Sequence, residues 1–474
     1  MPLFNNSTMC HTSAILLLAS LTFILNGCTS LRTDKSHYAN IQPLLAQADY
    51  PAVIARIEGA KQKAYTYKDR VVYYLDIGML HHWNGDYEKS NEFLEKAERS
   101  IEENFTKSIT RAAASLLIND NTLAYAGEDY EDIYLNAFKA LNYLALNQPD
   151  SAFVEVRRIN NKLALLESKH AKMAKSLSVA EEAQETFSPG KNYFVESALG
   201  RYLSALLYRN DHKWDDVRID FEKIEQGWKL QPDIYPFSSP DFSRSRKEVG
   251  NGIARLNIIA FSGLAPEKQA TSFYVHTEEN LIVLAGSSED YLGRQNLSDF
   301  QTIFWPNVSA GYHFKFQLPQ MKRKTSQVGR IEIEVNGVQT ETLQKLESLE
   351  NAAVETFSIK KPMIYLKTLT RAVSKGITAE QAKQKMTKDM GEGAALFTRL
   401  AADLLVDQTE NADLRTSRFF PAEASIRELH LEDGVYDISI NFFSHNGTLL
   451  HSDTKAGVHI EAGKLNVLES AYLD

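Results

Sequence analysis

The sequence of 474 residues predicts an α+β protein, with an α-helical repeat domain in its first half and a β-sandwich-like domain in its second. From Ile41 to about Ile224, apolar residues recur at the spacing of amphipathic helices. After residue 252 they alternate with polar residues, as in half-buried strands, and Asn-Gly pairs mark hairpin turns. The overall composition, 43% hydrophobic and 24% charged, is typical of a folded globular protein.

The start of the chain carries an apolar run, Ala14 to Leu25, that contains no charged residue. Twelve residues are too few for a permanent membrane span but suit the hydrophobic part of a secretory signal. The run leads into Leu25-Asn26-Gly27-Cys28, which resembles the lipobox of bacterial lipoproteins. That resemblance implies that residues 1–27 are a lipoprotein signal peptide and that Cys28 becomes lipidated and N-acylated after cleavage. An ordinary cleaved signal or a short membrane anchor is the alternative.

The residues next to this cysteine suggest where the protein would be held. In the lipoprotein sorting rule, an Asp after the lipidated Cys favours the inner membrane, so Thr29 implies the outer membrane. Residues 28–40 are short and polar, and we expect them to be a tether. Several acyl chains anchor a protein far more firmly than one chain does.

Charge and cysteine content narrow the possible functions. The formal net charge of −9 argues against a nucleic-acid partner. Cys10 and Cys28 are the only cysteines, so the 447 residues that remain after removal of 27 (474 − 27) would contain no disulfide. No His-Glu-x-x-His motif occurs either. We therefore predict no metal and no cofactor.

Residues 41–230 contain a recurring phrase in which a tight turn precedes an aromatic residue and a helix. The phrase occurs at Ala48-Asp49-Tyr50, Gly85-Asp86-Tyr87, Gly127 to Tyr130 and Asp211 to Trp214. The second unit resembles a tetratricopeptide repeat through Tyr74, Ile77, Gly78, Gly85, Tyr87, Leu94 and Ala97. This resemblance implies stacked helix pairs with a concave groove for peptides or partner helices. A plain helical bundle is the alternative.

The later helical segments and the boundary between the halves are predicted from composition. Residues 163–190 are rich in Ala, Ser, Lys and Glu, and we expect a long solvent-facing helix ending at Ser188-Pro189-Gly190. The next helix is expected from Asn192 to Tyr208. Prolines and serines accumulate over residues 231–252, which predicts a linker between domains.

The β-rich domain is predicted over residues 253–474. The alternating segments are Ile253–Phe261, Ser272–His276, Phe314–Leu318, Gly329–Val335, Ser425–Leu431, Gly434–Phe443, Thr448–Ser452 and Val458 onward. Asn336-Gly337 and Asn446-Gly447 are expected to form hairpin turns. Residues 341–411 return to Ala, Lys, Gln and Glu, which predicts a helical insertion within the sandwich. Two small separate domains are the alternative.

Charged residues inside apolar phrases are the candidate site residues. Glu155 and Arg158 lie three apart on one helix, which predicts an ion pair, while Arg157 points elsewhere and could bind an anion. Arg371, Asp413 and Arg415, together with Lys375, interrupt otherwise apolar phrases. We expect buried ion pairs that fix the orientation of the two halves, or else a pocket for a phosphate, a glycan carboxylate or a peptide C-terminus. Lys268, after a predicted turn, is expected to be solvated.

Several phrases in a fixed order resemble an uncharacterised family of bacterial outer-membrane lipoproteins with a tetratricopeptide-like first half. They are Tyr130-Glu131, Asn142-Tyr143-Leu144, Val154-Glu155 with Arg157-Arg158, Tyr202 to Tyr208, Gly263 to Lys268, Thr370-Arg371-Ala372 with Lys375, and Ala412 to Arg415 before Pro421. Genes of this family often lie beside those of lipoproteins that activate penicillin-binding proteins. The resemblance therefore implies a role in the cell envelope, by association only.

The sequence contains little that indicates catalysis. There is neither a Gly-x-Ser-x-Gly elbow nor a P-loop. Ser358 to Lys361 spells Ser-x-x-Lys, but the following Pro362 argues against the helix that this motif needs. We expect a non-enzymatic lipoprotein of the outer membrane, facing the periplasm, that binds protein partners of the cell envelope. The alternatives are a peptidoglycan-binding protein or wall-acting enzyme with a site at the junction of the halves, and an assembly subunit of a larger machine.

Overall fold

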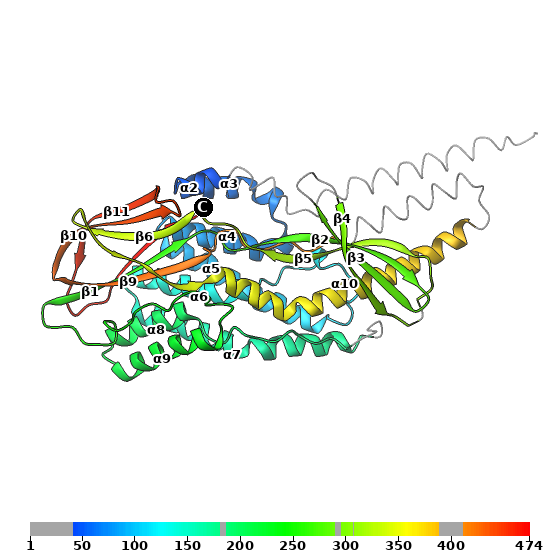
Figure 1. Cartoon of the computed structure of the whole chain (residues 1–474), viewed down its shortest axis with the longest axis horizontal. Helices are drawn as coiled ribbons and strands as arrows, with labels where there is room; N and C mark the ends of the chain where they lie inside the picture. The colour runs from blue at the N-terminus through cyan, green and yellow to red at the C-terminus, as the bar shows by residue number, and fades with distance from the viewer. Residues whose placement is uncertain (1–40, 181–185, 290–294, 307, 388–410) are drawn as a thin grey trace, which may run out of the picture.

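The computed structural model describes residues 41–180, 186–289, 295–306, 308–387 and 411–474. Helices form the first half and mainly antiparallel sheets form the second, which confirms the predicted mixture of helix and sheet (Figure 1). The expected signal peptide, the expected tether and Cys28 lie outside the described residues. So does the later part of the predicted helical insertion, residues 388–410.

The first half consists of consecutive helices that pack in pairs. Their bounds are α2 Gln42–Ala46, α3 Tyr50–Ala64, α4 Arg70–Trp83, α5 Tyr87–Thr110, α6 Asp129–Ala145, α7 Pro149–Ser178, α8 Ala198–Asn210 and α9 Trp214–Leu230, with short 3-10 turns η3 Tyr67–Asp69 and η4 Asp120–Thr122. Helix α2 packs on α3, α4 on α5, α6 on α7 and α8 on α9, and these four pairs contact one another through α3 with α4, α5 with α6 and α7 with α8. The short connections make each pair a helical hairpin.

All four hairpins use the same three-residue turn. Its middle residue has a positive φ: 54° at Ala48, 77° at Gly85, 56° at Asn147 and 56° at His212. The next N–H donates to the carbonyl five residues earlier, as from Asp86 to His81 at 2.9 Å. This bond pattern is that of a Schellman cap, which satisfies the last carbonyls of the first helix.

The third occurrence of the recurring phrase has a different role from the one we expected. Gly127, with φ 78°, precedes α6 and therefore lies between two hairpins. The residue that corresponds to Gly85 is Asn147, two positions before Pro149 at the start of α7. A proline suits the first turn of a helix because its missing N–H would have had no partner there.

Two helix boundaries were predicted wrongly. Helix α7 runs over Pro149–Ser178, so it begins earlier than the predicted residue 163 and ends earlier than the predicted residue 190. Helix α8 begins at Ala198, because the Ser197 side chain accepts a hydrogen bond from the N–H of Gly200 and caps the helix there. Between them Gly190 donates its N–H to the carbonyl of Ile359 at 2.7 Å, so this segment is held by another element instead of continuing a helix.

The second half contains three four-stranded sheets. The bounds are β1 Ile253–Ser262, β2 Glu267–Glu278, β3 Leu281–Glu289, β4 Gln295–Phe304, β5 His313–Lys322, β6 Val328–Val335, β7 Val338–Thr342, β8 Gln344–Ser348, β9 Glu423–Glu432, β10 Gly434–Ser444, β11 Leu449–Ile460 and β12 Asn466–Tyr472. The strand orders are β12-β1-β9-β8, β11-β10-β6-β7 and β4-β3-β2-β5, called here the first, second and third sheets. Only the β1–β12 pairing is parallel among the described strands.

Strand β1 is buried on both faces and connects the two halves. Leu256 and Ile258 point into a core between the first and second sheets, with Ile440 and Phe442 of β10. The alternate residue Phe261 faces the helices, where its ring lies 5.2 Å from that of Phe138. The helical core therefore continues into the first sheet. Residues 231–252, where we predict a linker, bury Ile234, Tyr235 and Phe242 in this same core.

The third sheet is covered by helix α10, Leu349–Thr387, which lies along the middle of the molecule (Figure 1). Leu369, Ala372 and Val373 of this helix pack on the sheet. Two expectations about this region were wrong. The helix begins at Leu349, because residues 338–348 form β7 and β8, and it continues through Pro362. Burial of Ile359 and Met363 on either side of the proline stabilises the helix there.

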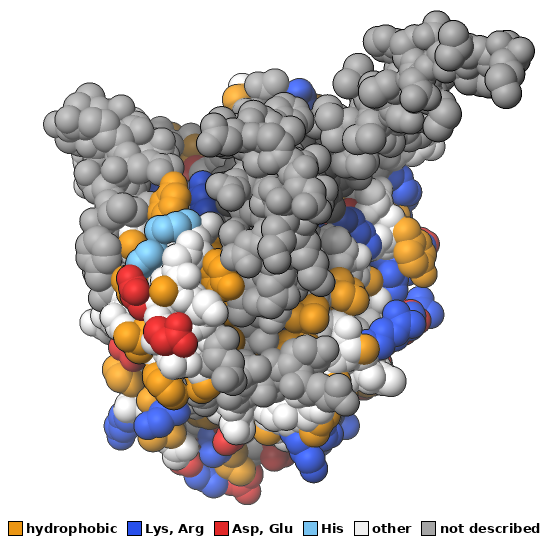
Figure 2. Space-filling model, turned by 90° about the vertical axis from the view of Figure 1, so that its right-hand side faces the viewer, with side chains coloured by type: hydrophobic (Ala, Val, Ile, Leu, Met, Phe, Trp, Pro, Cys, Tyr) orange, Lys and Arg blue, Asp and Glu red, His pale blue; other side chains and the backbone are white. Residues whose placement is uncertain are grey.

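The surface has mixed polarity. Figure 2 views the end of the molecule near the third sheet, where hydrophobic, acidic and basic side chains are interspersed over the described part. Among the described helices, none combines the length and apolar character needed to cross a membrane.

Candidate functional site

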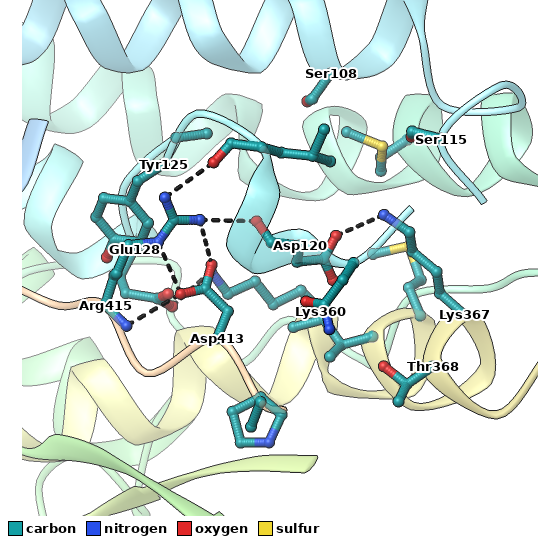
Figure 3. A pocket seen from close by; sticks show the side chains of 18 of the residues that line it. Ser108, Ser115, Asp120, Tyr125, Glu128, Lys360, Lys367, Thr368, Asp413 and Arg415 are labelled. Carbon is teal, nitrogen blue, oxygen red and sulfur yellow. Dashed lines mark hydrogen bonds and ion pairs between the residues drawn. The ribbon is translucent and has the colours of Figure 1, made fainter. Parts of the chain in front are cut away.

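A cavity of about 230 Å³ lies where the two halves meet (Figure 3). Its walls come from the ends of α5 and α7, from η4 and the loop before α6, from β2 and β5, from α10 and from residues 411–415. Apolar side chains line much of it: Phe105, Ala112, Leu123, Met173, Leu177, Pro319, Met363 and Ile364. Charged and uncharged polar side chains form the rest of the wall, and nearly all of the charged ones are in ion pairs.

Residues 411–417, called the strap here, pass over the loop before α6. Arg415 is 4% exposed and binds Asp413 at 2.7 Å and Asp69 at 3.1 Å. Its guanidinium also donates to the carbonyls of Leu123 and Asp120, both at 2.9 Å. Burial acts to raise the pKa of Asp413, but the Arg415 charge outweighs it and holds that pKa well below the usual range. Asp413 is therefore ionised and paired with the guanidinium of Arg415.

Glu128 is shared by two lysines from distant parts of the chain. Lys268 of β2 and Lys360 of α10 both form ion pairs with this carboxylate, Lys360 at 2.5 Å. Lys268 is 5% exposed, so the expectation that it is solvated was wrong. Burial acts to lower the pKa of Lys268, but the attraction of Glu128 outweighs it and raises the pKa. Lys268 is therefore charged at neutral pH despite its burial.

Further pairs surround the same cavity. Asp129 binds Lys169 and His170, each at 2.7 Å, and burial, which acts to raise the pKa of Asp129, is outweighed by these partners, so that this pKa lies well below its usual range. Lys367 binds Asp120 at 2.5 Å, as Figure 3 shows. The buried Arg371 donates to the carbonyl of Ile118 at 3.2 Å.

Behind the cavity wall, Glu131 of α6 holds the strap. Its carboxylate accepts hydrogen bonds from the N–H of Ser417 at 2.5 Å and the hydroxyl of Thr416 at 3.0 Å. It also accepts from the hydroxyl of Tyr125 at 2.8 Å and the N–H of Glu128 at 2.7 Å. Burial, followed by the repulsion of Glu128, raises the pKa of Glu131 to about 7.

The buried Asp76 of α4 anchors the strap at a second point. It accepts from the hydroxyl of Ser417 at 2.9 Å and from the N–H of Arg418 at 3.0 Å. The hydroxyl of Tyr65 donates to its other oxygen at 2.9 Å. The strap is thus joined by polar contacts to both α4 and α6.

The residues predicted on α7 lie elsewhere. Glu155 and Arg158 form the expected pair at 3.6 Å, whereas the exposed Arg157 stacks over the ring of Phe153 at 4.3 Å. Arg371, Asp413 and Arg415 line the cavity, and Glu155, Arg157 and Arg158 do not. The six candidate residues therefore do not converge on one site.

A larger hollow of about 690 Å³ lies between α5 and α7 and is called the groove here. Its α7 wall is basic, with Arg158, Lys162, Lys169 and Lys172, and its α5 wall contains Glu95, Glu98, Glu102 and Arg99. Apolar residues lie between these walls: Ile101, Ile133, Leu165 and Leu166. Lys162 joins the two sides by binding Glu98 of α5 and Asp132 of α6, both at 2.7 Å.

A buried ammonium also lies beside the groove. Lys139 of α6 is 1% exposed and binds Glu95 at 2.7 Å, Glu98 at 2.8 Å and Glu155 at 3.1 Å. The surrounding carboxylates raise the pKa of Lys139 despite its burial. This cluster gives Glu155 a structural partner on α6 in addition to Arg158.

Sequence reasoning missed Glu128, Lys360, Lys367 and Asp120. A partial signal existed for Glu128, because Glu128 and Glu131 have the spacing of a capping box at the start of α6, and the structure contains that box. For Lys360 and Lys367 no local pattern distinguishes them from the solvated lysines of the same helix.

The described part of the chain contains no group of three or more His, Cys, Asp or Glu side chains arranged to hold a metal ion. His81 and His82 are instead buried in packing and hydrogen bonds, with His82 between Asn142 at 2.7 Å and Glu469 at 2.6 Å. No protein-family model, curated protein or solved structure matches this chain.

Proposed function

We propose that this protein is a lipid-anchored lipoprotein of the outer membrane, facing the periplasm, that acts as a non-enzymatic scaffold for protein partners in the cell envelope. Residues 1–27 are its signal peptide, Cys28 carries the lipid, and residues 28–40 are the tether. The helical half is a set of tetratricopeptide-like repeats, a proposal supported by four hairpins with one common turn. The β half is a sandwich with α10 inserted, which the shared core of the first and second sheets supports.

The groove between α5 and α7 is the single observation that carries the scaffold proposal. It offers apolar surface between a basic wall and a largely acidic wall. An amphipathic helix or an extended segment of a partner would bury its apolar residues there and place acidic residues against α7. Leu165, at 62%, is the most exposed of the large apolar side chains that line the groove.

The charged residues at the junction of the halves support a structural role over a catalytic one. Asp413 is paired with Arg415, and Glu128 with Lys268 and Lys360, so these carboxylates are already neutralised. A general acid or base needs a pKa near the working pH, whereas the pKa of Asp413 is strongly lowered. The alternative is a protein that binds or hydrolyses peptidoglycan. It is supported only by the cavity that Arg371, Asp413 and Arg415 line together.

The anchor is tested by labelling cells with palmitate and comparing the wild type with Cys28→Ala. We expect label in the wild type, in the outer-membrane fraction, and none in the variant. An unlabelled wild type would remove the anchor from the proposal, and label in the inner membrane would contradict the role assigned to Thr29.

The groove is tested with a photo-crosslinking residue placed at position 165 or at position 230. Leu165 and Leu230 are both 62% exposed, but only Leu165 lines the groove, so the second position is a matched control. We expect one crosslinked envelope protein from position 165 only. Lys172→Glu, on the basic wall, should reduce that product, whereas Lys175→Glu, which lies outside the groove, should not. Equal products from both positions would contradict the proposal.

A further inference from the structure

We propose that the cavity at the junction of the two halves binds a small amphipathic anion. Its acidic head group contacts the ammonium groups of Lys268 and Lys360, and its apolar body lies against the walls formed by α5, α7 and α10. The cavity adjoins the groove, since Phe105, Asp129 and Lys169 line both, but Lys268 and Lys360 line the cavity alone. The proposal does not depend on the scaffold role.

The two lysines have unused hydrogen-bonding capacity. An ammonium group has three N–H donors and no acceptor. Within the part of the chain that the structure describes, Lys268 and Lys360 each form an ion pair with Glu128 alone. One carboxylate thus serves two ammonium groups, and Lys268 is 5% exposed, so bulk water does not replace the missing acceptors.

The same arrangement leaves a local positive charge beside the cavity. The Lys and Arg side chains that line the cavity are Lys169, Lys268, Lys360, Lys367, Arg371 and Arg415, and the carboxylates that line it are Asp120, Glu128, Asp129 and Asp413, which leaves two positive charges in excess (6 − 4). Asp69, which binds Arg415 from outside the cavity wall, reduces this excess to one. Lys367, with a single ion pair to Asp120, is one of these cations. A buried charge without a counterion is costly, so an anion that enters here is stabilised by more than hydrogen bonding.

Apolar side chains line another part of the cavity, so we expect the anion to have an apolar body. Phe105, Ala112, Met173, Leu177 and Met363 present hydrocarbon and thioether surface to the same space. The cavity of about 230 Å³ exceeds the roughly 150 Å³ of an engineered apolar cavity that holds benzene. An apolar cavity with a few converging polar groups is the usual form of a small-molecule site.

A cation or a neutral molecule fits less well. The carboxylates of the wall are already paired: Asp413 with Arg415, Asp129 with Lys169, and Asp120 with Lys367. A cationic ligand would find no free carboxylate among these and would lie close to two ammonium groups. Water would satisfy the N–H donors but would leave the charge uncompensated.

The test measures binding to the purified full-length protein by titration calorimetry, with octanoate as the probe. Octylammonium has the same tail with the opposite charge, and acetate has the same head group without a tail. We expect saturable binding of octanoate, at least tenfold tighter than either control compound. Octyl phosphate distinguishes the head groups: tighter binding than octanoate assigns a phosphate ligand, and weaker binding assigns a carboxylate. Failure of both octyl anions to bind, or equal binding of octylammonium, would overturn the proposal.

Variants of α10 then locate the site. Lys360→Gln should weaken octanoate binding about tenfold or more, and Lys360→Arg should retain most of it. Lys361→Gln is the matched control, because Lys361 is exposed and lies outside the cavity wall. Thermal unfolding of each variant checks that it is folded. If Lys360→Gln does not fold, the comparison of octanoate with octylammonium on the wild-type protein still tests whether the cavity binds an anion. Unchanged binding by folded Lys360→Gln would show that octanoate binds elsewhere and would overturn the assignment.

Discussion

Arg415 and Asp69 lie 346 residues apart in the chain and form a buried ion pair of 3.1 Å. Asp69 ends η3, directly before α4, and Arg415 lies in the strap that returns from the β half. The pair therefore joins the two halves, with Asp413 as the second carboxylate on the same guanidinium. The buried Asp69 and the partly buried Asp413 thus share this one guanidinium at the junction of the halves.

Replacing Arg415 should destabilise the whole protein. Arg415→Met would leave the buried Asp69 and the partly buried Asp413 without the guanidinium that binds both, and breaking a buried pair in this way costs on the order of 3–5 kcal/mol. Urea unfolding followed by circular dichroism measures the change. Arg157→Met serves as the control, because Arg157 is exposed and only stacks on Phe153, a contact that contributes about 0.5–1 kcal/mol. Equal losses in the two variants would contradict the role given to the strap.

Glu131 should make stability fall as pH rises from the ordinary range of a glutamate to about 7. Burial raises its pKa to about 7 in the folded state, so between the two values the folded protein binds more protons than the unfolded chain. The loss is complete above pH 7 and is on the order of 3 kcal/mol, at about 1.36 kcal/mol for each pKa unit. It is absent below the unfolded pKa.

The measurement is the free energy of unfolding at several pH values for the wild type and Glu131→Gln. Since the variant cannot ionise at this position, its stability should fall less steeply between pH 5 and 7 than that of the wild type. Glu103→Gln is the control: Glu103 is on α5, exposed, and should leave the wild-type slope unchanged. Parallel curves for the wild type and Glu131→Gln would refute the assignment.

Gly78 should be required for the contact between α4 and α5. A Cβ at this position would lie 2.7 Å from Cδ2 and 2.9 Å from Cγ of Leu94, and 3.3 Å from its backbone nitrogen. Gly78→Ala should therefore lower the free energy of unfolding by about 1–3 kcal/mol through overpacking. Gly59→Ala provides the contrast, because nothing lies within 4 Å of that Cβ and alanine favours a helix by about 0.5–1 kcal/mol. The two substitutions should change the melting temperature in opposite directions.

The common hairpin turn predicts opposite effects at two equivalent positions. Gly85 and Ala48 both occupy its left-handed position, with φ of 77° and 54°. Gly85→Ala should lower stability by about 1 kcal/mol, because a Cβ is disfavoured there, and Ala48→Gly should raise stability slightly for the same reason. Chemical denaturation of both variants checks this. A stabilising Gly85→Ala would mean that the turn does not need the left-handed conformation.

Much of the local structure was predictable because its signals are local. Gly85-Asp86-Tyr87 marked a hairpin turn, and the Asn-Gly pair at 336–337 joins β6 to β7 with positive φ at both residues. Strands β1, β9 and β10 begin and end within two residues of their predicted bounds. Strands β3 and β4 were not predicted at all. Residues 449–460 form the single strand β11, where two segments were expected.

The parts of the fold that were not predicted depend on contacts between distant segments. Helix α10 continues through Pro362, because burial of Ile359 and Met363 outweighs the hydrogen bond lost at the proline. The helix predicted from Asn192 begins instead at Ala198, and Gly190 bonds to Ile359, 169 residues later (359 − 190). No local propensity contains that information.

Some residues of the candidate site were also predictable from local sequence, and others depend on contacts between distant segments. Arg371, Asp413 and Arg415 were identified because charged residues interrupt apolar phrases, and the structure places them around one cavity. Lys268 was assigned to solvent, and Lys360 was not singled out, because a lysine on a turn or a helix is usually exposed. Their shared partner Glu128 belongs to a third segment of the chain.

The sequence by itself determined the helical character of the first half and the positions of several strands and turns, such as β1, β9, β10 and the turn at Gly85, since backbone conformation and hydrophobic period depend on neighbouring residues. Only the tertiary structure decided which charges neutralise one another, where the cavity forms and why Glu131 has a raised pKa. The physical reason is that burial and Coulomb interaction depend on distances in space. The atoms that set those distances come from residues hundreds of positions apart, such as Asp69 and Arg415.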